Sequence, residues 1–421
     1  MPKAQLISAI DIGTTKITTV IASVSPDREK INVIGVSNEP AKGLRKSQIV
    51  DIDETIESIT KSVEAAERMA GYSISSALAS ISGIHIESLN SKGVVAVAEP
   101  DGEIDENDVA RVIEAARAVS LPSSREVLHV IPRDFKVDSQ EGVKDPVGMG
   151  GIRLEAEAHL VSGSSTAMRN IRKCIAEIGI EVDSLVFSGL ASAEAVLTAT
   201  EKELGVVLVD LGGGSASVAI FVDGALSYSS VLPVGAKNIT NDLAIGLRVS
   251  LESAEKIKLG LSRVNDAEGE SDELDVKKLN LNEEVGKLSK KTLVEGIIRP
   301  RLNEIFSLIG DEIKKSGFGG VTPAGVVVTG GGALTVGLSS ACKRSLSLPV
   351  RLGYPKGLSG LVDEIKSPAF ATAWGLIEYG IKNAKGIKSD SSMKAMSKLI
   401  GKIPLKGAVD KVIKLVKSFL P

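Results

Sequence analysis

The chain has 421 residues, of which 43% are hydrophobic and 3% aromatic, enough for one large two-lobed domain or several small ones. So few aromatic side chains argue against a base-stacking surface for single-stranded nucleic acid, and no apolar run approaches the ~18–20 residues that a transmembrane helix needs. The net charge of −3 is unevenly distributed, because residues 382–421 contain ten lysines and two aspartates, which leaves −11 for residues 1–381. An acidic body with a basic tail is unlike a general DNA-binding protein and indicates a tail that meets an anionic surface.

The first half of the chain predicts a strand, a glycine-containing turn and a second strand over residues 6–24. An apolar face with helical spacing predicts a helix over residues 53–71. Residues 83–163 differ in pattern from the residues on either side, because they consist of short β runs around a helix at 106–119. This pattern indicates a small α+β unit inserted into the first domain. A helix and a strand are expected over residues 165–187.

The second half repeats the hairpin pattern over residues 205–226. Helices are predicted over 238–260 and 293–315, and the acidic, then basic residues 262–292 between them are expected to be a surface excursion. The strand in GVVVTGGGAL precedes another helix, and SPAFATAWGLIEYG is predicted to be a final helix of small residues.

The two hairpins align as DIGTTKITTVIA, which starts at Asp11, over DLGGGSASVAIF, which starts at Asp210. Each has an apolar strand that ends in aspartate, then a glycine-containing turn and an alternating strand. A repeat spaced by about 200 residues indicates two related domains rather than a solenoid. The alternative is two unrelated glycine-rich hairpins, which is disfavoured because the aspartate occupies the same place in both.

A turn of glycine, threonine and serine directs several backbone N–H groups and hydroxyls at one point, and so forms a cradle for phosphate. An aspartate just before the turn is compatible with phosphate if a cation lies between them, and Mg²⁺ is suited to this because it keeps several of its waters. Two such hairpins from two domains would hold a nucleotide from both sides. The candidates are Asp11 and Asp210 as Mg²⁺ ligands through water, with the turn residues Gly13, Thr14, Thr15, Gly212, Gly213, Gly214 and Ser215 around the phosphates.

A third glycine-rich piece, Gly330, Gly331 and Gly332, ends a strand and opens a helix, a geometry in which a base or sugar can lie against bare backbone. Its spacing is neither that of a dinucleotide-binding loop nor that of a Walker A loop, and an ordinary helix N-terminal turn is the alternative. Glu255 and Lys258 are candidates for gripping a ribose and a base edge. The alternative for this pair is a solvated helix face.

DIGTTK, DLGGGSAS and VTGGGA, in this order and spacing, resemble the phosphate 1, phosphate 2 and adenosine motifs of the superfamily of actin, sugar kinases and DnaK-type chaperones. SGLASAEAV and SPAFATAWG resemble its two hinge helices between domains. The insert with DPVGMGGIRLEAEAHLVSG, the segment PVGAKNITNDLA and a basic C-terminal helix are similar to the FtsA family of bacterial cell division proteins, and the resemblance covers nearly the whole chain. It implies ATP and Mg²⁺ as ligands, and it extends the expected nucleotide-binding set to Lys16, Gly235 and Ala333.

The resemblance also implies an α/β fold of duplicated actin-like, ribonuclease H-like domains with an inserted SHS2-like α+β subdomain. The expected boundaries are 1–82 and 164–200 for domain 1, 83–163 for the insert, 201–366 for domain 2 with a subdomain at about 236–315, 367–381 for the second hinge helix, 382–407 for a flexible linker and 408–421 for an amphipathic membrane-targeting helix.

One stretch departs from the superfamily pattern. Where chaperones carry an acidic residue and actin a glutamine to position the attacking water, this chain has Ser188 and Gly189. Neither is a convincing general base, so at most a slow ATPase is expected, and chiefly a nucleotide-dependent scaffold. A sugar kinase would need an aspartate poised as base for a sugar hydroxyl, and the sequence offers no candidate for that role.

The C-terminal segment GAVDKVIKLVKSFLP predicts an amphipathic helix, since at ~100° per residue its apolar residues fall within an arc of roughly 160°. A length of only ~20 Å is too short to span a bilayer, so an in-plane membrane anchor is expected. The alternative is a helix docked on the protein's own core. The expected membrane contacts are the apolar Val409, Val412, Ile413, Val416, Phe419 and Leu420 and the basic Lys411, Lys414 and Lys417.

The resemblance implies a protein that polymerises into actin-like filaments at the cytoplasmic face of the cell membrane and anchors the ring of the tubulin-like protein FtsZ at the division site. Implied partners are the FtsZ C-terminal peptide, further copies of this chain, anionic lipids and later division proteins. Arg301 and Lys291 are candidates for receiving the acidic peptide, with ordinary surface charge as the alternative. Two other functions stay open: a PilM-like adaptor of a pilus or secretion inner-membrane complex, and an ATP-dependent kinase.

Overall fold

The computed structural model describes residues 5–25, 31–98, 102–263, 272–357, 359–360 and 365–383. The chain divides into two compact units, Met1–Glu378 and Tyr379–Pro421. Every sheet that the structure describes belongs to the first unit. The amphipathic helix expected at 408–421, and all of the expected linker beyond residue 383, lie outside the described residues.

Two of the sheets share a five-strand topology, as the hairpin repeat predicts, and the first has one further short strand that pairs with β3 at its edge. The first has the strand order β11-β6-β1-β2-β3-β19 and the second the order β14-β13-β12-β17-β18. In each sheet three consecutive strands form an antiparallel meander: β1 to β3 in the first sheet and β12 to β14 in the second. Two further strands then add in parallel beside the first strand of the meander: β6 and then β11 beside β1, and β17 and then β18 beside β12. The first sheet contains β1 (Gln5–Ile12), β2 (Lys16–Val24), β3 (Ile31–Pro40), β6 (Ser76–Ile81), β11 (Glu181–Phe187) and β19 (Ser359–Gly360). The second contains β12 (Val206–Leu211), β13 (Ala216–Val222), β14 (Ala225–Leu232), β17 (Val326–Thr329) and β18 (Val350–Leu352).

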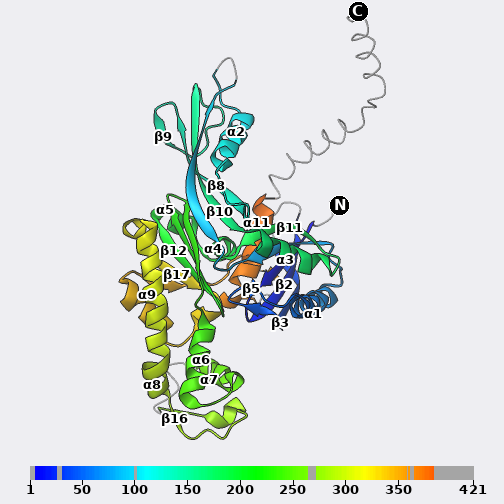
Figure 1. Ribbon diagram of the computed structural model, residues 1–421, viewed down its shortest axis with the longest axis vertical. Coiled ribbons are helices and arrows are strands. Elements are labelled where there is room, and N and C mark those ends of the chain that lie inside the picture. Colours follow the sequence, from blue (N-terminus) through cyan, green and yellow to red (C-terminus); the bar gives the residue numbers. More distant parts are fainter. Residues whose placement is uncertain are drawn as a thin grey trace, which may run out of the picture. The chain divides into compact units, whose positions relative to one another are not determined.

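Helices pack on both sheets (Figure 1). On the first sheet α1 lies against β2 and β3, and α3 lies against α1 and β11. The side chain of Asp51 accepts a hydrogen bond from Glu54 N and begins α1, and Gly71 ends the helix with a left-handed backbone. On the second sheet α4 contacts β12 and β13, and α10 contacts α9 and β18. The helices are α1 (Ile52–Ala70), α3 (Ser165–Ala176), α4 (Ser188–Val196), α5 (Ala199–Leu204), α6 (Ala236–Leu247), α7 (Leu251–Arg263), α8 (Lys290–Leu293), α9 (Arg299–Ser316), α10 (Leu338–Leu346) and α11 (Ala371–Asn383).

The inserted unit forms a sheet of its own in the order β7-β10-β8-β9, with α2 (Glu106–Arg117) packed across β7 and β10. Its strands are β7 (Glu87–Ala96), β8 (Arg125–Val137), β9 (Gln140–Val143) and β10 (Arg153–Ser164). The predicted fold class, with two related sheets and an inserted α+β unit, is confirmed.

The insert contacts β14, the edge strand of the second sheet, through polar side chains. Ser88 Oγ donates to Ser229 O at 2.7 Å, Asn90 donates to Ser227 O at 3.2 Å, and His159 Nε2 lies 3.0 Å from Ser229 Oγ. These contacts satisfy backbone groups that an edge strand otherwise presents to solvent. Burial lowers the pKa of His159 to about 3, so this histidine is neutral and its role is structural.

Two predicted helices differ from the structure in the second domain. The single helix expected over 238–260 is two helices, α6 and α7, because Arg248 adopts a left-handed backbone with φ 56° and ends α6. The helix expected over 293–315 begins at Lys290 and passes through a π-helical turn, Val294–Ile298, before α9.

The segment expected to be a surface excursion, 262–292, is partly a packed element. Its described part forms two short strands, β15 (Glu273–Leu274) and β16 (Leu288–Ser289), and Leu274 and Leu288 are buried in the core of the second domain. Charge in the surrounding residues hid these two leucines from the sequence pattern. The third glycine-rich piece itself opens a 3₁₀ turn, Gly331–Leu334, and α10 begins only at Leu338.

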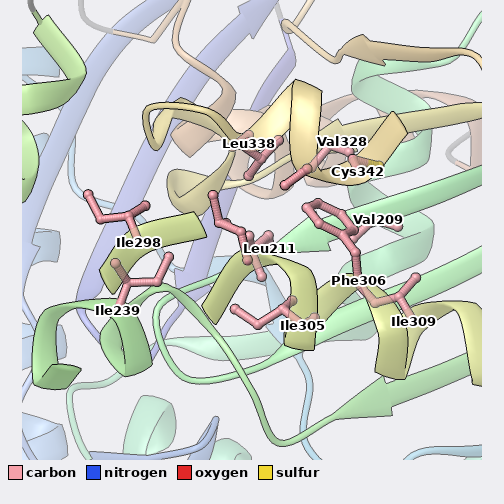
Figure 2. Close-up of a cluster of buried hydrophobic side chains, with 14 of the residues drawn as sticks. Val209, Leu211, Ile239, Ile298, Ile305, Phe306, Ile309, Val328, Leu338 and Cys342 are labelled. Carbon is pink, nitrogen blue, oxygen red and sulfur yellow. The ribbon is translucent and has the colours of Figure 1, made fainter. Parts of the chain in front are cut away.

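An extensive hydrophobic cluster lies between the second sheet and its helices. Figure 2 shows Val209 and Leu211 from β12 meeting Ile305, Phe306 and Ile309 from α9. All five are at most 1% exposed, and fully burying an aliphatic or aromatic side chain of this size contributes about 1.5–3 kcal/mol. This packing holds β12 in place, and β12 ends at one of the predicted phosphate turns.

The two predicted hinge helices, α4 and α11, approach each other closely. A Cβ on Gly375 of α11 would lie 1.8 Å from the carbonyl oxygen of Ala191 in α4. Ser192 Oγ and Thr372 Oγ1 are 2.9 Å apart in the same crossing. Only glycine at position 375 permits this approach, which brings side chains from both helices to the end of β12.

Candidate functional site

The two hairpin turns close with the same backbone hydrogen bond. The N–H of Gly13 donates to Lys16 O at 3.0 Å, and the N–H of Gly212 donates to Ser215 O at 2.9 Å. In both hairpins the aspartate lies two residues before that glycine. The duplication seen in the sequence therefore extends to the backbone geometry of the turns.

The turns face each other across one cavity. A Cβ on Gly213 would lie 2.3 Å from Thr15 Cγ2, so the second turn needs glycine to approach the first. Gly330, after β17, has φ 85°, and a Cβ there would lie 2.3 Å from Asp210 Oδ1. The cavity is lined by Asp11, Ile12, Gly13, Thr14, Thr15, Lys16, Ser47, Ser80, Ser82, Ser188, Asp210, Gly212, Gly213, Ser215, Ser217, Gly330, Gly331, Ala369 and Thr372.

Both predicted Mg²⁺ ligands lie in this cavity and hold hydroxyl partners. Ser80 Oγ donates to Asp11 Oδ1 at 2.8 Å, while Ser192 and Thr372 donate to Asp210 Oδ2 at 2.5 and 2.9 Å. Burial raises the pKa of Asp11 to about 6, and burial also raises the pKa of Asp210. Two partly desolvated carboxylates facing one cavity favour the binding of a cation.

Lys16 brings an ammonium group into the same cavity. Its Nζ is buried without a hydrogen-bond partner among the residues that the structure describes, and it lies 3.9 Å from the centre of the Phe370 ring. Burial lowers the pKa of Lys16 to about 8, although Asp11 and Asp210 oppose that effect. An unpaired buried ammonium beside two carboxylates and two glycine-rich turns fits a phosphate accompanied by Mg²⁺.

Six residues of the predicted nucleotide-binding set do not line this cavity. Gly235 lies behind the second turn, where a Cβ would be 2.5 Å from Gly213 O. Glu255 and Lys258 form an ion pair at 2.7 Å, and both bond the Thr240 hydroxyl, so they join α7 to α6 instead. The other three are Gly214, which packs against the Thr14 side chain, and Gly332 and Ala333, which lie behind Gly331.

Several hydroxyl-bearing residues of the cavity were missed by the sequence reasoning. Ser82 and Ser217 are two of them, 3.2 Å apart between hydroxyl oxygens, and Ser217 also lies 2.9 Å from the hydroxyl of Ser188, which the sequence had placed near the water position. Ser47, Ser80 and Thr372 reach the site from three further elements. A lone serine or threonine carries little signal, although Ser80 ends an apolar strand much as Asp11 does.

Comparisons with known proteins agree with this geometry. A family model described as "SHS2 domain inserted in FTSA" matches residues 83–162, and one described as "Cell division protein FtsA" matches residues 207–375. The cell division protein FtsA of Pseudomonas aeruginosa is 38% identical to this chain over 403 residues, which cover 95% of either protein. The chain belongs to the FtsA family.

Solved structures share the actin-like fold of this FtsA-family chain. A chain of the PilM–PilN type IV pilus biogenesis complex matches with a TM-score of 0.61 and 16% identity, over 89% of this chain and 98% of that one. MreB5 of Spiroplasma citri bound to AMPPNP matches with a TM-score of 0.55 and 13% identity, over 93% and 100%. At these identities the likeness concerns the fold alone, so it does not favour a pilus adaptor.

The two candidate partner residues of the FtsA-family chain have different surroundings. Arg301 makes two hydrogen bonds with the Asp242 carboxylate, at 2.5 and 2.9 Å, and a third with Glu304 at 2.6 Å, and the Asp242 bonds raise its pKa. The side chain of Lys291 is exposed at the start of the α8–α9 helix. An acidic peptide would have to compete with Asp242 for Arg301, whereas Lys291 is accessible. No helix within the described residues is long and apolar enough to cross a membrane.

Proposed function

We propose that this FtsA-family protein binds ATP with Mg²⁺ between its two duplicated domains, and uses the complex to assemble a membrane-bound scaffold for cell division. The observation that carries the proposal is the meeting of two equivalent hairpins in one cavity, each with an aspartate and a glycine-containing turn. A relative by fold, MreB5 of Spiroplasma citri, was solved bound to AMPPNP.

In this proposal Asp11 and Asp210 hold the cation through its waters, and the cation neutralises phosphate charge. Backbone N–H groups and hydroxyls of Thr14, Thr15 and Ser215 donate to phosphate oxygens. The Lys16 ammonium gains an anionic partner in place of its present contact with an aromatic ring. Gly331 and its neighbours give the nucleoside a surface of bare backbone.

Glu255 and Lys258 can contact the ribose and base edge, as the sequence suggests, only after a structural change. They lie outside the cavity lining and are paired with each other. To contact the ribose and base edge, α7 has to move toward Gly331 or the pair has to separate. The nucleoside contacts of the glycine backbone need no such change.

Hydrolysis in this site is slow. Ser188 occupies the stretch in which the superfamily carries its water-positioning residue, and its hydroxyl contacts that of the neighbouring Ser217. Serine hydroxyls can orient water but are poor proton acceptors. Slow turnover suits a protein whose nucleotide governs assembly rather than metabolism. Phosphoryl transfer to a sugar would need a base that these hydroxyls do not supply.

The scaffold proposal extends to the membrane and to the division ring. The segment 408–421 inserts its apolar face in the plane of the cytoplasmic leaflet, beside anionic lipids that attract its lysines. One such helix binds the membrane weakly. A filament that carries many copies binds tightly, because each bound helix keeps its neighbours at a high effective concentration near the lipid. Lys291, and Arg301 once released from Asp242, receive the acidic C-terminal peptide of FtsZ at the division site, where later division proteins follow.

Co-sedimentation with vesicles tests this function. The full chain with ATP and Mg²⁺ should pellet with vesicles that contain anionic lipid, and a chain ending at Lys406 should stay in the supernatant. Replacing Lys411, Lys414 and Lys417 together by glutamine should weaken binding to anionic vesicles more than to neutral ones, and flatten its salt dependence. Equal pelleting of the full and shortened chains would contradict the proposed anchor.

A further inference from the structure

Ser47 lies between the two phosphate turns but belongs to neither. It is at the tip of a short hairpin made by β4 (Leu44–Arg45) and β5 (Gln48–Ile49). Its N–H donates to Thr14 Oγ1 at 2.8 Å, and its hydroxyl oxygen lies 2.7 Å from Ser215 Oγ. A third element of the fold therefore links the first phosphate turn to the second.

The tip of this hairpin has an uncommon backbone conformation. Lys46 and Ser47 have φ values of 50° and 59°, in the left-handed region that glycine and asparagine occupy more readily. Such a backbone persists where its surroundings hold it, and it is frequent at ligand sites. The base of the hairpin is held as well, since Val50 N and Asp51 N donate to Gly43 O at 2.8 and 3.1 Å. Ser47 is thus presented to the cavity on a fixed support.

The donors of Ser47 converge with those proposed for phosphate. Thr14 and Ser215 are buried lining residues of the cavity, at 5% and 6% exposed, and each has a hydroxyl group that contacts Ser47. A phosphate oxygen that lies against this pair can also accept from the Ser47 N–H and O–H, in place of the neutral hydroxyl oxygens that these two groups contact now. Both groups are donors, and hydrogen bonds to a charged acceptor are roughly twice as strong as neutral ones.

Strand order indicates which phosphate Ser47 would meet. The cavity follows the ends of β17, β12 and β13, which are neighbours in that order in the second sheet. The proposed nucleoside surface at Gly330 and Gly331 is next to β17, and Asp210 lies on β12 in the middle. Ser215, the partner of Ser47, immediately precedes β13 at the opposite end. The terminal phosphate of a bound nucleotide, the one farthest from the nucleoside, is therefore expected to lie nearest Ser47.

We propose that Ser47 contacts the terminal phosphoryl group of the bound nucleotide through its N–H and its hydroxyl, and so favours a nucleoside triphosphate over a diphosphate. The inference rests on the proposed nucleotide site. It adds a residue outside both phosphate turns and gives that residue a role in telling the two nucleotides apart.

Two glycine substitutions in the same turn form a matched pair. Ser47→Gly removes the hydroxyl and relaxes one left-handed residue, while Lys46→Gly relaxes its neighbour and removes no donor aimed at the cavity. Affinities of the full-length proteins for ATP and for ADP, each with Mg²⁺, are measured by calorimetry. Ser47→Gly should weaken ATP binding about tenfold, the usual effect of losing one hydrogen bond to a charged group, and leave ADP binding within about twofold.

Lys46→Gly should leave both affinities unchanged. An equal loss of ATP and ADP affinity in Ser47→Gly would overturn the assignment to the terminal phosphate. An equal loss of ATP affinity in the two variants would show that turn stiffness, not the hydroxyl, is responsible. Wild-type protein that binds neither nucleotide would overturn the proposed function itself, a result distinct from the other two. Ser47→Ala, which also lacks the hydroxyl, should repeat the ATP-specific loss.

Discussion

Lowering the pH from 7.5 to 5.0 should weaken Mg²⁺–ATP binding, because the cation requires an ionised Asp11. Burial raises the pKa of Asp11 to about 6, although Lys16 and the hydroxyl of Ser80 oppose the effect. A carboxyl group with that pKa is about 97% ionised at pH 7.5 and about 9% ionised at pH 5.0, so the apparent affinity falls about tenfold, or roughly 1.4 kcal/mol. The affinity for Mg²⁺–ATP is thus highest at pH values above the pKa of Asp11, and it falls as the pH drops through that pKa. Burial raises the pKa of Asp210 too, which acts in the same direction.

Calorimetric titrations at fixed free Mg²⁺ and several pH values measure this effect. Asp11→Asn is the control, since it keeps an acceptor for the Ser80 hydroxyl but cannot titrate. The variant should bind Mg²⁺–ATP more weakly at pH 7.5 and respond less to pH, and the ratio of the two proteins cancels the protonation of ATP itself. Binding of adenosine should not depend on pH in this range. Identical pH responses of the wild type and Asp11→Asn would refute the role of this carboxylate.

Three further predictions concern the hinge, the turnover and the anchor. Gly375→Ala should destabilise the protein by about 1–3 kcal/mol or more in urea unfolding, because the added methyl meets backbone in the facing hinge helix. Gly296→Ala, a helical position with open space around it, should be neutral or stabilising by up to ~1 kcal/mol, and equal effects would argue against the close crossing. ATP turnover should stay below the ~1–100 per second of ordinary kinases, since Ser188 is not a base; a rate within that range would contradict the slow site. Val416→Glu should abolish vesicle binding while Ser418→Glu preserves it, whereas a lower melting temperature with unchanged lipid binding would mean that the helix belongs to the folded core.

The parts of the fold that repeat in the sequence were predictable. Asp11 and Asp210 are about 200 residues apart, yet the shared pattern around them indicated two related domains, and the structure brings both into one cavity. The apolar strands before the turns carried enough signal because β12 is buried at every position and β1 is buried over residues 8–10 and at Ile12. The inserted unit could be predicted because its short β runs around one helix differ from the sequence pattern of the two parts of the first domain on either side.

The rest depends on contacts that no local pattern encodes. The break after α6 results from the left-handed backbone of Arg248, a residue with no special preference for it. Glu255 and Lys258 pair with each other across one helical turn and are not among the residues that line the cavity, a placement that their charges alone do not predict. Ser47 and Thr372 reach the site only because the topology brings the ends of distant elements together. Their residue types are too common to be recognised in advance.

Titration of ATP into the wild type, Asp11→Ala and Asp210→Ala, with and without Mg²⁺, tests the nucleotide site most directly. The wild type should bind one ATP per chain with a strong dependence on Mg²⁺. Asp210→Ala and Asp11→Ala should lose most of that dependence and keep their affinity for adenosine. Unchanged Mg²⁺-dependent ATP affinity in both variants would contradict the assignment of the cavity between the two hairpins as the nucleotide site.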